Sequence, residues 1–481
     1  MSRLLVSAAH KSSGKTTVSV GLCAALTARG LAVQPFKKGP DYIDPMWLSQ
    51  ASGHPCFNLD PFLMSPGEIS ALFERQSAGA DISLVEGNKG LYDGLALDGS
   101  NSNAALAHLL DLPVLLVIDA RGMTRGIAPL ILGYQAFDRR IRIAGVILNQ
   151  LGGSRHEAKL RAVVEHYTDV PVLGAIGHDP RLTVVERHLG LMPNHEMDDA
   201  AQRVRAIGEL IAAQVDLDRV LAVGASAAVL PPSDKLVEVK VPAAAPVRIG
   251  LARDKAFGFY YPDDLLALQA AGAEIVPFDT LNDTALPEVD GLFIGGGFPE
   301  MFMAELEANA GMRASIGAAI EAGLPVYAEC GGLMYLARSL SWQGRSYRMV
   351  GAIPADVLMH ERPVGRGYVE LTPTEPPLWP TTSQGTADQL RGHEFHYSSL
   401  ENLDPGIAFA YRVTRGHGVD GQRDGIVYRN VLASYAHLRS INAQGWAPRF
   451  VAFVRAKKKN STASSSAASV APKRYETTVA V

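Results

Sequence analysis

Short runs of apolar, often β-branched residues alternate with longer stretches of helical character through the first half of the chain. Strands are predicted at 4–8, 32–35, 82–86, 114–119, 143–148 and 172–176, and helices at 15–29 and 198–214. Continuous apolar strands separated by helices are typical of a parallel sheet that is covered on both faces. The first half is therefore predicted to be an α/β domain.

The same alternation restarts after a segment rich in proline and alanine. Strands are predicted at 247–252, 274–278, 291–294 and 325–328, and helices at 263–271 and 300–322, which indicates a second α/β domain. The last residues include a lysine run and a serine-rich stretch of low complexity, typical of a disordered tail. The predicted organisation is two domains at 1–225 and 247–455, a linker at 226–246 and a tail at 456–481.

Composition and charge exclude several classes of protein. The 481 residues carry a net charge of −4, which argues against nucleic acid as the main partner. We find no apolar run near the roughly 20 residues needed to cross a bilayer, and the first residues are typical of a strand and not of a signal peptide. Three scattered cysteines favour a reducing compartment, and we expect a cytoplasmic protein without a membrane partner.

A phosphate-binding loop is predicted between the first strand and the first helix. Residues 9–17 read AHKSSGKTT, so Gly14, Lys15, Thr16 and Thr17 match the end of the GxxxxGK[ST] pattern, whereas Ala9 replaces its first glycine. Backbone N–H groups at a helix N-terminus attract phosphate, the lysine reaches the outer phosphates, and the Thr16 hydroxyl can bind Mg²⁺. The expected ligands are ATP and Mg²⁺.

Acidic loops follow the second and third strands. Asp44 and Glu86 are the predicted carboxylates on the metal side, because ligands of open parallel sheets gather at the carboxyl ends of the strands. Asn149 ends a later strand and is a candidate nucleotide-binding residue, with a turn at Gly152-Gly153 as the alternative. The same loops supply the candidate substrate-binding residues, which are Asp41, Tyr42, Lys89 and Asp93.

A nucleophile is predicted at Cys330, which sits between an apolar strand and a helix and is followed by two glycines. A thiol at such a turn is exposed at a helix N-terminus that favours the thiolate, although an isolated cysteine is more often a buried structural residue. Backbone N–H groups of Gly296, Gly297 and Gly331 are the predicted oxyanion hole. Spacing alone leaves three histidines open as the base: His393, His396 and His437.

Ordered blocks over residues 3–455 resemble the cobyrinic acid a,c-diamide synthase family. The blocks are SGKTT, KKGPDYIDP, EGNKGLYDG, RDKAFGFYYP, GGGFPE, AECGGLMYL, GHEFHYS and ASYAHL. The resemblance implies a dethiobiotin-synthetase-like ATP domain joined to a class I glutamine amidotransferase domain. It also implies that Cys330 is the glutaminase nucleophile and His437 its base, as a dyad without a third acidic member.

The resemblance further implies the reaction. Glutamine supplies ammonia, ATP activates the a and c acetate carboxylates of a tetrapyrrole as acyl phosphates, and ammonia displaces phosphate to form amides in cobalamin biosynthesis. Basic residues at the predicted site are candidate carboxylate partners or solvated surface charges: Lys37, Lys38, Lys89 and Arg121.

Alternative functions remain at this point. The lysines at 11, 38 and 89 are more similar to relatives that amidate sirohaem or nickel-sirohydrochlorin. A deviant-Walker partitioning-type ATPase would explain Lys11 but not a second domain with its own nucleophile, and a regulator with a decayed amidotransferase domain is the third hypothesis. We carry a homodimer as a further hypothesis.

Overall fold

The computed structural model describes residues 1–179, 186–187, 190–197, 199–230, 245–374, 377–379, 389–440 and 445–468. Two compact units make up the chain. The first comprises Met1–Val237 and Phe259–Asp263, and the second comprises Glu238–Gly258 and Asp264–Val481. Most of the predicted linker at 226–246 lies outside the described residues, which resume at 245.

The first unit is built on a seven-stranded parallel sheet of order β3-β2-β4-β1-β5-β6-β7. Its strands are β1 Ser2–Ala8, β2 Val33–Lys38, β3 Phe57–Leu59, β4 Ile82–Glu86, β5 Val114–Asp119, β6 Ile143–Leu151 and β7 Val172–Gly177. Its helices are α1 Lys15–Ala28, α2 Ile43–Ser52, α3 Pro66–Ser77, α4 Asn103–Leu109, α5 Ile127–Phe137, α6 Ser154–Tyr167, α7 Ala200–Gln214 and α8 Leu217–Ala225. The short elements β8 Glu186–Arg187, β9 Gly190–Leu191 and η2 Asn194–Glu196 precede α7.

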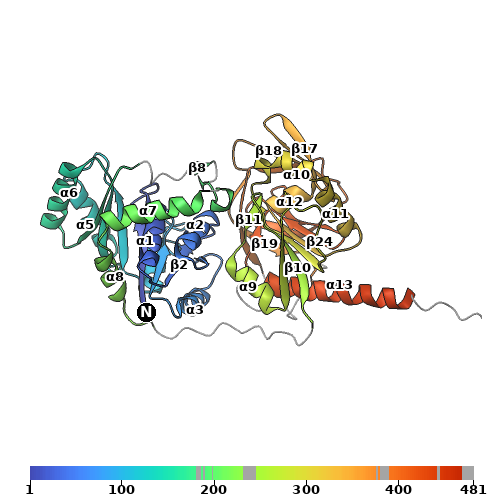
Figure 1. The fold of residues 1–481 in the computed structure, drawn as a ribbon, viewed down its shortest axis with the longest axis horizontal. Helices are drawn as coiled ribbons and strands as arrows, with labels where there is room; N and C mark the ends of the chain where they lie inside the picture. Colours follow the sequence, from blue (N-terminus) through green and yellow to red (C-terminus); the bar gives the residue numbers. More distant parts are fainter. Residues whose placement is uncertain are drawn as a thin grey trace, which may run out of the picture. The chain divides into compact units, whose positions relative to one another are not determined.

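Close helix packing fixes α1, the helix that carries the predicted phosphate loop. Helix α7 lies along it (Figure 1), and Gly21 of α1 faces Ile211 of α7 so closely that a Cβ would come within 2.2 Å of Ile211 Cγ1. Gly208 of α7 is also close to α1, because a Cβ on Gly208 would lie 2.8 Å from Ala24 Cβ. Small residues on both helices therefore let the two backbones pack tightly and hold the start of α1 in place.

The second unit is built on a ten-stranded mixed sheet of order β12-β10-β13-β15-β24-β23-β22-β19-β20-β25, parallel from β12 to β24 and antiparallel beyond. Its strands are β10 Val247–Ala252, β12 Ala273–Phe278, β13 Gly291–Ile294, β15 Val326–Glu329, β19 Gly365–Pro373, β20 Leu390–His396, β22 Ala408–Arg415, β23 Arg423–Tyr428, β24 Val431–Ser434 and β25 His437–Leu438. Two smaller sheets hold β11 Phe257–Phe259 with β14 Gly296–Gly297, and β16 Ala337–Trp342, β17 Arg345–Arg348, β18 Ile353–Met359 and β21 Ser398–Glu401. The helices are α9 Pro262–Ala270, η3 Pro299–Met301, α10 Met303–Ala308, α11 Ala310–Glu321, α12 Gly331–Leu336 and α13 Trp446–Ala468.

The α/β prediction is confirmed for both halves, whereas the bounds of one predicted helix are corrected. The predicted helix at 300–322 is divided at Asn309, whose side chain accepts from Met312 N and donates to Thr280 O, so that it caps α11 and ends α10. Before His437 the chain forms a hairpin of β23 and β24. The strands from β16 to β22 were not predicted individually.

Helix α13 corrects the predicted end of the folded chain. It runs to Ala468, so it includes the first part of the segment predicted as a tail from 456, and Figure 1 shows it extending away from the sheet of its unit. Phe450 and Val454 are fully buried on this helix, and Lys458 pairs with Asp290 at 2.8 Å, so apolar anchors and an ion pair carry the helix past 455. Within the described residues, we find no helix that combines the length and apolarity of a membrane span.

Candidate active site

The phosphate loop leaves β1 and enters α1 through residues with left-handed backbone. Ser12 has φ 66° and Gly14 has φ 84°, and α1 begins at Lys15. Asn149, near the end of β6, donates from Nδ2 to Ser13 O at 2.9 Å. Gly14 and Asn149, which were each predicted to bind nucleotide, are therefore brought together, and the asparagine supports the loop that a nucleotide would occupy.

A cluster of buried charges lies at the start of α1. Glu86 Oε1 receives Lys15 Nζ at 2.6 Å, Thr16 Oγ1 at 2.7 Å and Lys37 Nζ at 3.0 Å. Asp44, in the first turn of α2, accepts from Thr16 Oγ1 at 3.2 Å and from Lys37. The register of the sheet explains this contact, because Lys37 of β2 pairs directly with Glu86 of β4. Lys37 is therefore an internal counter-ion, only 1% exposed, and not a solvated surface charge.

Electrostatics in this cluster keep both ion-pair partners charged. Burial opposes the charge on Lys37, but the charges of Asp44, Glu86 and Asp41 outweigh it and hold the pKa of the ammonium well above its usual value. Burial likewise opposes ionisation of Asp44, yet Lys37 and Lys15 keep the pKa of this carboxyl below its usual value. Asp41 differs, because burial and the neighbouring Asp44 charge raise its pKa to about 6.

The donor set of this cluster fits Mg²⁺. Glu86 is fully buried, and its Oε2 has no hydrogen-bond partner among the described residues, so one carboxylate oxygen is left for another ligand. Mg²⁺ is typically held by one or two carboxylates together with water and substrate phosphates, and Thr16, Asp44 and Glu86 supply such a set. In the described part of the chain, we find no group of three or more His, Cys, Asp or Glu side chains arranged as a complete metal site.

The predicted nucleophile sits at a strained turn in the second unit. Cys330 has φ 47° and ψ −100° between β15 and α12, and its N–H donates to Ser434 O at 2.7 Å. Gly332 has no room for a side chain, because a Cβ there would lie 2.2 Å from Ile294 O. A non-glycine residue held at positive φ costs free energy and typically marks a functional turn. The elbow geometry is therefore present, but the thiol is buried and not exposed as predicted.

One of the three candidate histidines contacts the thiol. His437 is 3% exposed and hydrogen-bonds Cys330. Burial opposes its charge, but the hydrogen bonds to Cys330 and Glu329 and the charges of both groups raise the pKa of the imidazole to about 10. His393 stacks on it with ring centroids 4.8 Å apart, and burial and the His437 charge hold the pKa of His393 well below its usual value. His396 instead stacks on Tyr435.

This histidine has an acidic contact that was not predicted from the sequence. Glu329, the last residue of β15, places Oε2 3.2 Å from His437 Nδ1. The expected dyad therefore has a carboxylate beside it in the structure. The signal in the sequence was a glutamate at the carboxyl end of a buried strand, immediately before the nucleophile.

The predicted oxyanion-hole glycines converge on the same elbow. Gly297 of β14 packs against Gly331, so that a Cβ on Gly331 would lie 3.0 Å from Gly297 N. Gly297 is itself confined, because its own Cβ would fall 1.9 Å from Ala256 O. Backbone N–H groups thus lie close to Cys330, as stabilisation of a tetrahedral oxyanion requires.

Both halves of the chain match known domain families. Residues 248–444 match the CobB/CobQ-like glutamine amidotransferase domain, and residues 2–186 match an AAA domain. Cobyrinate a,c-diamide synthase of Magnetococcus marinus is 47% identical over 457 residues, which cover 94% of this chain and 97% of that protein. The proteins of the same name from Methanosarcina acetivorans and Listeria monocytogenes serovar 1/2a are 44% and 41% identical over 91% of this chain and 92% and 96% of theirs. The chain belongs to the cobyrinate a,c-diamide synthase family.

As a member of this family, the protein is a glutamine-hydrolysing carbon–nitrogen ligase that uses ATP and glutamine. Its two units each contain one of the two candidate sites. The buried Lys15–Glu86–Lys37 cluster belongs to the first unit, and the Cys330–His437 pair belongs to the second.

The predicted substrate residues of this family member lie in contrasting environments. Tyr42 is buried, Lys89 and Asp93 are exposed, and Asp93 Oδ2 accepts from Gly90 N at 2.9 Å, which closes the loop after β4. Lys38 is buried and donates to Asn101 O at 2.5 Å and to Asn88 Oδ1 at 3.2 Å.

Two of the basic candidates have partners that limit a role in binding substrate. Lys38 braces a loop through its hydrogen bonds to Asn101 and Asn88, so it is not a free surface cation. Its burial also lowers the pKa of the ammonium to about 8. Arg121 is exposed and pairs with Asp119 at 2.6 Å.

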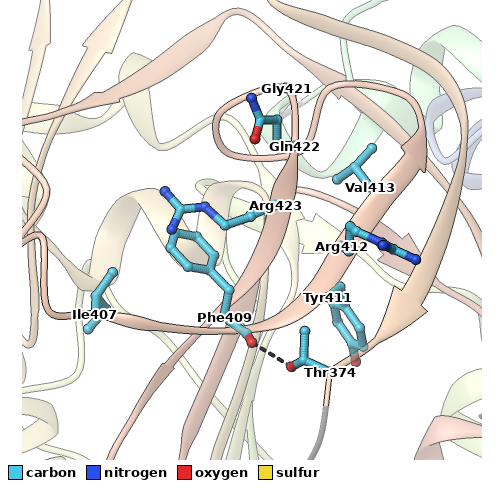
Figure 2. A pocket seen from close by; sticks show the side chains of 9 residues that line it. All are labelled: Thr374, Ile407, Phe409, Tyr411, Arg412, Val413, Gly421, Gln422 and Arg423. Carbon is cyan, nitrogen blue, oxygen red and sulfur yellow. Dashed lines mark hydrogen bonds between the residues drawn. The ribbon is translucent and has the colours of Figure 1, made fainter.

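A separate hollow in the second unit does not contain the predicted site residues. It has a volume of about 580 Å³ and is lined mainly by residues of β22, β23 and the turn between them, together with Thr374 after β19 and Ile407 before β22 (Figure 2). Its Arg423 lies over the Phe409 ring at 4.2 Å and pairs with Asp420 at 2.7 Å, so this guanidinium is already engaged. The candidate active site is therefore assigned to the Cys330 elbow and the phosphate loop, and not to this hollow.

Proposed function

We propose that the protein amidates the a and c acetate carboxylates of cobyrinate, with glutamine as the nitrogen donor and ATP as the activating substrate. The contact of His437 with Cys330 at a strained elbow, in a relative of cobyrinate a,c-diamide synthases, carries this proposal. Soluble small molecules are then the partners of the chain.

The second unit would release ammonia. The Cys330 thiolate attacks the side-chain carbonyl carbon of glutamine, the oxyanion is held by backbone N–H groups at Gly297 and Gly331, and protonated His437 donates a proton to the departing ammonia. Water then cleaves the thioester and releases glutamate. Burial of both residues and the raised pKa of His437 support this arrangement, because the imidazolium is the proton donor that this step needs.

The first unit would activate the carboxylate. A substrate carboxylate oxygen attacks the γ-phosphorus of ATP, ADP leaves, and ammonia displaces phosphate from the acyl phosphate to give the amide. Lys15 and the N-terminus of α1 would hold the phosphates, and Thr16, Asp44 and Glu86 would hold Mg²⁺, which neutralises phosphate charge when it is bound. The free Glu86 Oε2 supports the assignment of this metal position.

Two kinds of tetrapyrrole are candidate substrates of the chain. Lys11 and Lys89, which favoured sirohaem or nickel-sirohydrochlorin, are exposed in the first unit, whereas Lys38 is buried and braces the Asn88–Asn101 loop. The deviant-Walker hypothesis leaves the Cys330–His437 pair unexplained. We therefore favour cobyrinate and keep the sirohaem branch as the second candidate.

A substrate panel tests the proposal directly. Purified protein with MgATP and glutamine is offered cobyrinate, hydrogenobyrinate, sirohaem and nickel-sirohydrochlorin, and the products are identified by mass. Each acid-to-amide conversion lowers the mass by about one unit, and two conversions on cobyrinate are expected. Amidation of sirohaem alone would replace cobyrinate as the substrate and keep the mechanism, and amidation of none would overturn the proposal.

A further inference from the structure

We propose that Glu329 is a positioning residue of the glutaminase, which orients His437 and stabilises its protonated ring while Cys330 reacts. This inference rests on the proposed glutaminase roles of Cys330 and His437. It replaces the expected dyad by a linear arrangement in which the carboxylate comes from the residue directly before the nucleophile.

The geometry around Glu329 supports this role. Its Oε2 lies 3.2 Å from His437 Nδ1, while Oε1 accepts from Tyr327 OH at 2.5 Å and from Leu438 N at 3.0 Å. The carboxylate is 2% exposed, so these contacts are shielded from water. The Leu438 N–H and the His437 ring bind the two oxygens of one carboxylate. Glu329 therefore fixes both the backbone of β25 and the plane of the His437 ring.

Ring geometry assigns the two imidazole nitrogens to different partners. With Nδ1 directed to Glu329, Nε2 is the nitrogen that serves the Cys330 hydrogen bond, as in other acid–histidine–nucleophile arrangements. A buried carboxylate beside an imidazole favours the imidazolium, which is the form that donates a proton to departing ammonia.

The other ionisable groups facing His437 do not supply this charge. Cys330 hydrogen-bonds it from the elbow, His393 of β20 stacks on its ring and is kept neutral by burial, and Tyr327 of β15 reaches Glu329 and not the imidazole. Among these described neighbours, Glu329 is the carboxylate in contact with the ring.

A second buried carboxylate offers a matched structural control. Asp424 accepts from Tyr435 N at 3.0 Å, from Ala436 N at 2.9 Å and from Ser434 Oγ at 2.6 Å, so it holds the turn that leads into His437. It binds this turn through backbone and hydroxyl groups, whereas Glu329 contacts the imidazole. A comparison of variants at Asp424 and Glu329 therefore distinguishes the effect of losing the turn from the effect of losing the negative charge beside the imidazole ring.

The test is the pH profile of glutaminase activity in the full chain. Glu329→Gln keeps the size of the side chain and removes its charge. We expect kcat at neutral pH to fall about 10-fold to 100-fold. We also expect the alkaline limb of the profile to move to lower pH by about one unit or more, because the imidazolium then loses its proton more readily. Asp424→Asn is expected to lower the thermal midpoint and the rate without moving that limb.

Three results would overturn the inference. They are an unchanged profile in E329Q, a rate loss in E329Q that is equal at all pH values, and a shift in D424N as large as that in E329Q. Should E329Q fail to fold, Glu329→Asp keeps the charge but withdraws it by one methylene, and a smaller shift in the same direction is expected; no shift would contradict the inference. Cys330→Ser distinguishes failure of the proposed function from failure of this inference. Glutaminase activity that survives C330S would contradict the proposed function itself. Loss of activity in C330S together with a normal pH profile in E329Q would contradict only the role of Glu329.

Discussion

Gly14 and Asn149 are in such close contact that a Cβ on Gly14 would lie 2.1 Å from Asn149 Nδ2. The same Nδ2 donates to Ser13 O at 2.9 Å, and the Gly14 backbone has φ 84°. The end of β6 therefore fixes the entry to α1, and the loop tolerates no side chain at this glycine. The position of the phosphate loop depends on a residue that is 135 positions away in the sequence.

We expect Gly14→Ala to abolish nucleotide binding. The new Cβ displaces Asn149. The alanine must also adopt a left-handed backbone conformation, which alone costs roughly 1–2 kcal/mol. Titration calorimetry with MgATP checks this. Gly30→Ala is the control, because Gly30 has the same φ of 84° but nothing within 4 Å of a Cβ, so it should lose stability and keep ATP binding. Normal ATP affinity in G14A would contradict the role of the loop.

Removal of the charge at Glu86 should affect both stability and ATP chemistry. Glu86→Gln leaves Lys15 and Lys37 without a shared carboxylate, and breaking a buried pair typically costs about 3–5 kcal/mol. Urea unfolding measures the loss of stability. The rate of amidation with ammonia, measured at increasing Mg²⁺ concentration, reports the effect on ATP chemistry. Asp218→Asn breaks an exposed pair with Arg29 and should change stability by less than about 1 kcal/mol. Equal effects of the two variants would contradict the cluster as described.

The two units should be separable by their nitrogen source. Cys330→Ser is expected to abolish glutamine-dependent amidation and to leave ammonia-dependent amidation intact, because we propose that residues of the first unit activate the carboxylate. Cys56→Ala is the control, since this thiol is fully buried, its pKa is raised by burial, and it should be dispensable. Product mass with glutamine or ammonium salt distinguishes the outcomes, and loss of both activities in C330S would count against the division of labour.

His437 should make stability depend on pH. Its pKa rises from 6.5 to about 10 in the folded chain, so its contribution is full below the unfolded pKa and is lost as pH rises through the folded pKa. We expect the wild type to lose stability between about pH 6.5 and about pH 10 relative to His437→Gln. Denaturant midpoints of both proteins across this window provide the measurement, and parallel curves would show that the imidazolium is not stabilised by folding.

Much of the site followed from residue order along the chain. The strand–loop–helix around Lys15 and the elbow at Cys330 depend on local sequence, and both are present in the structure. Lys37 and Glu329 were different, because their roles arise from strand register and from contacts between residues 49 and 108 positions apart. A lysine in an apolar strand cannot be identified as an internal counter-ion until its neighbour across the sheet is known.

The shared carboxylates also bear on the order in which ligands bind. Two ammonium groups, Lys15 and Lys37, face three carboxylates, Asp41, Asp44 and Glu86, so these five side chains carry an excess of one negative charge. Such a cluster repels a bare polyphosphate and attracts a divalent cation. If Mg²⁺ binds here as proposed, we expect nucleotide chelated to Mg²⁺ to be the species that enters productively. An excess of free ATP should then behave as a weak competitor that slows turnover without altering the glutaminase half-reaction.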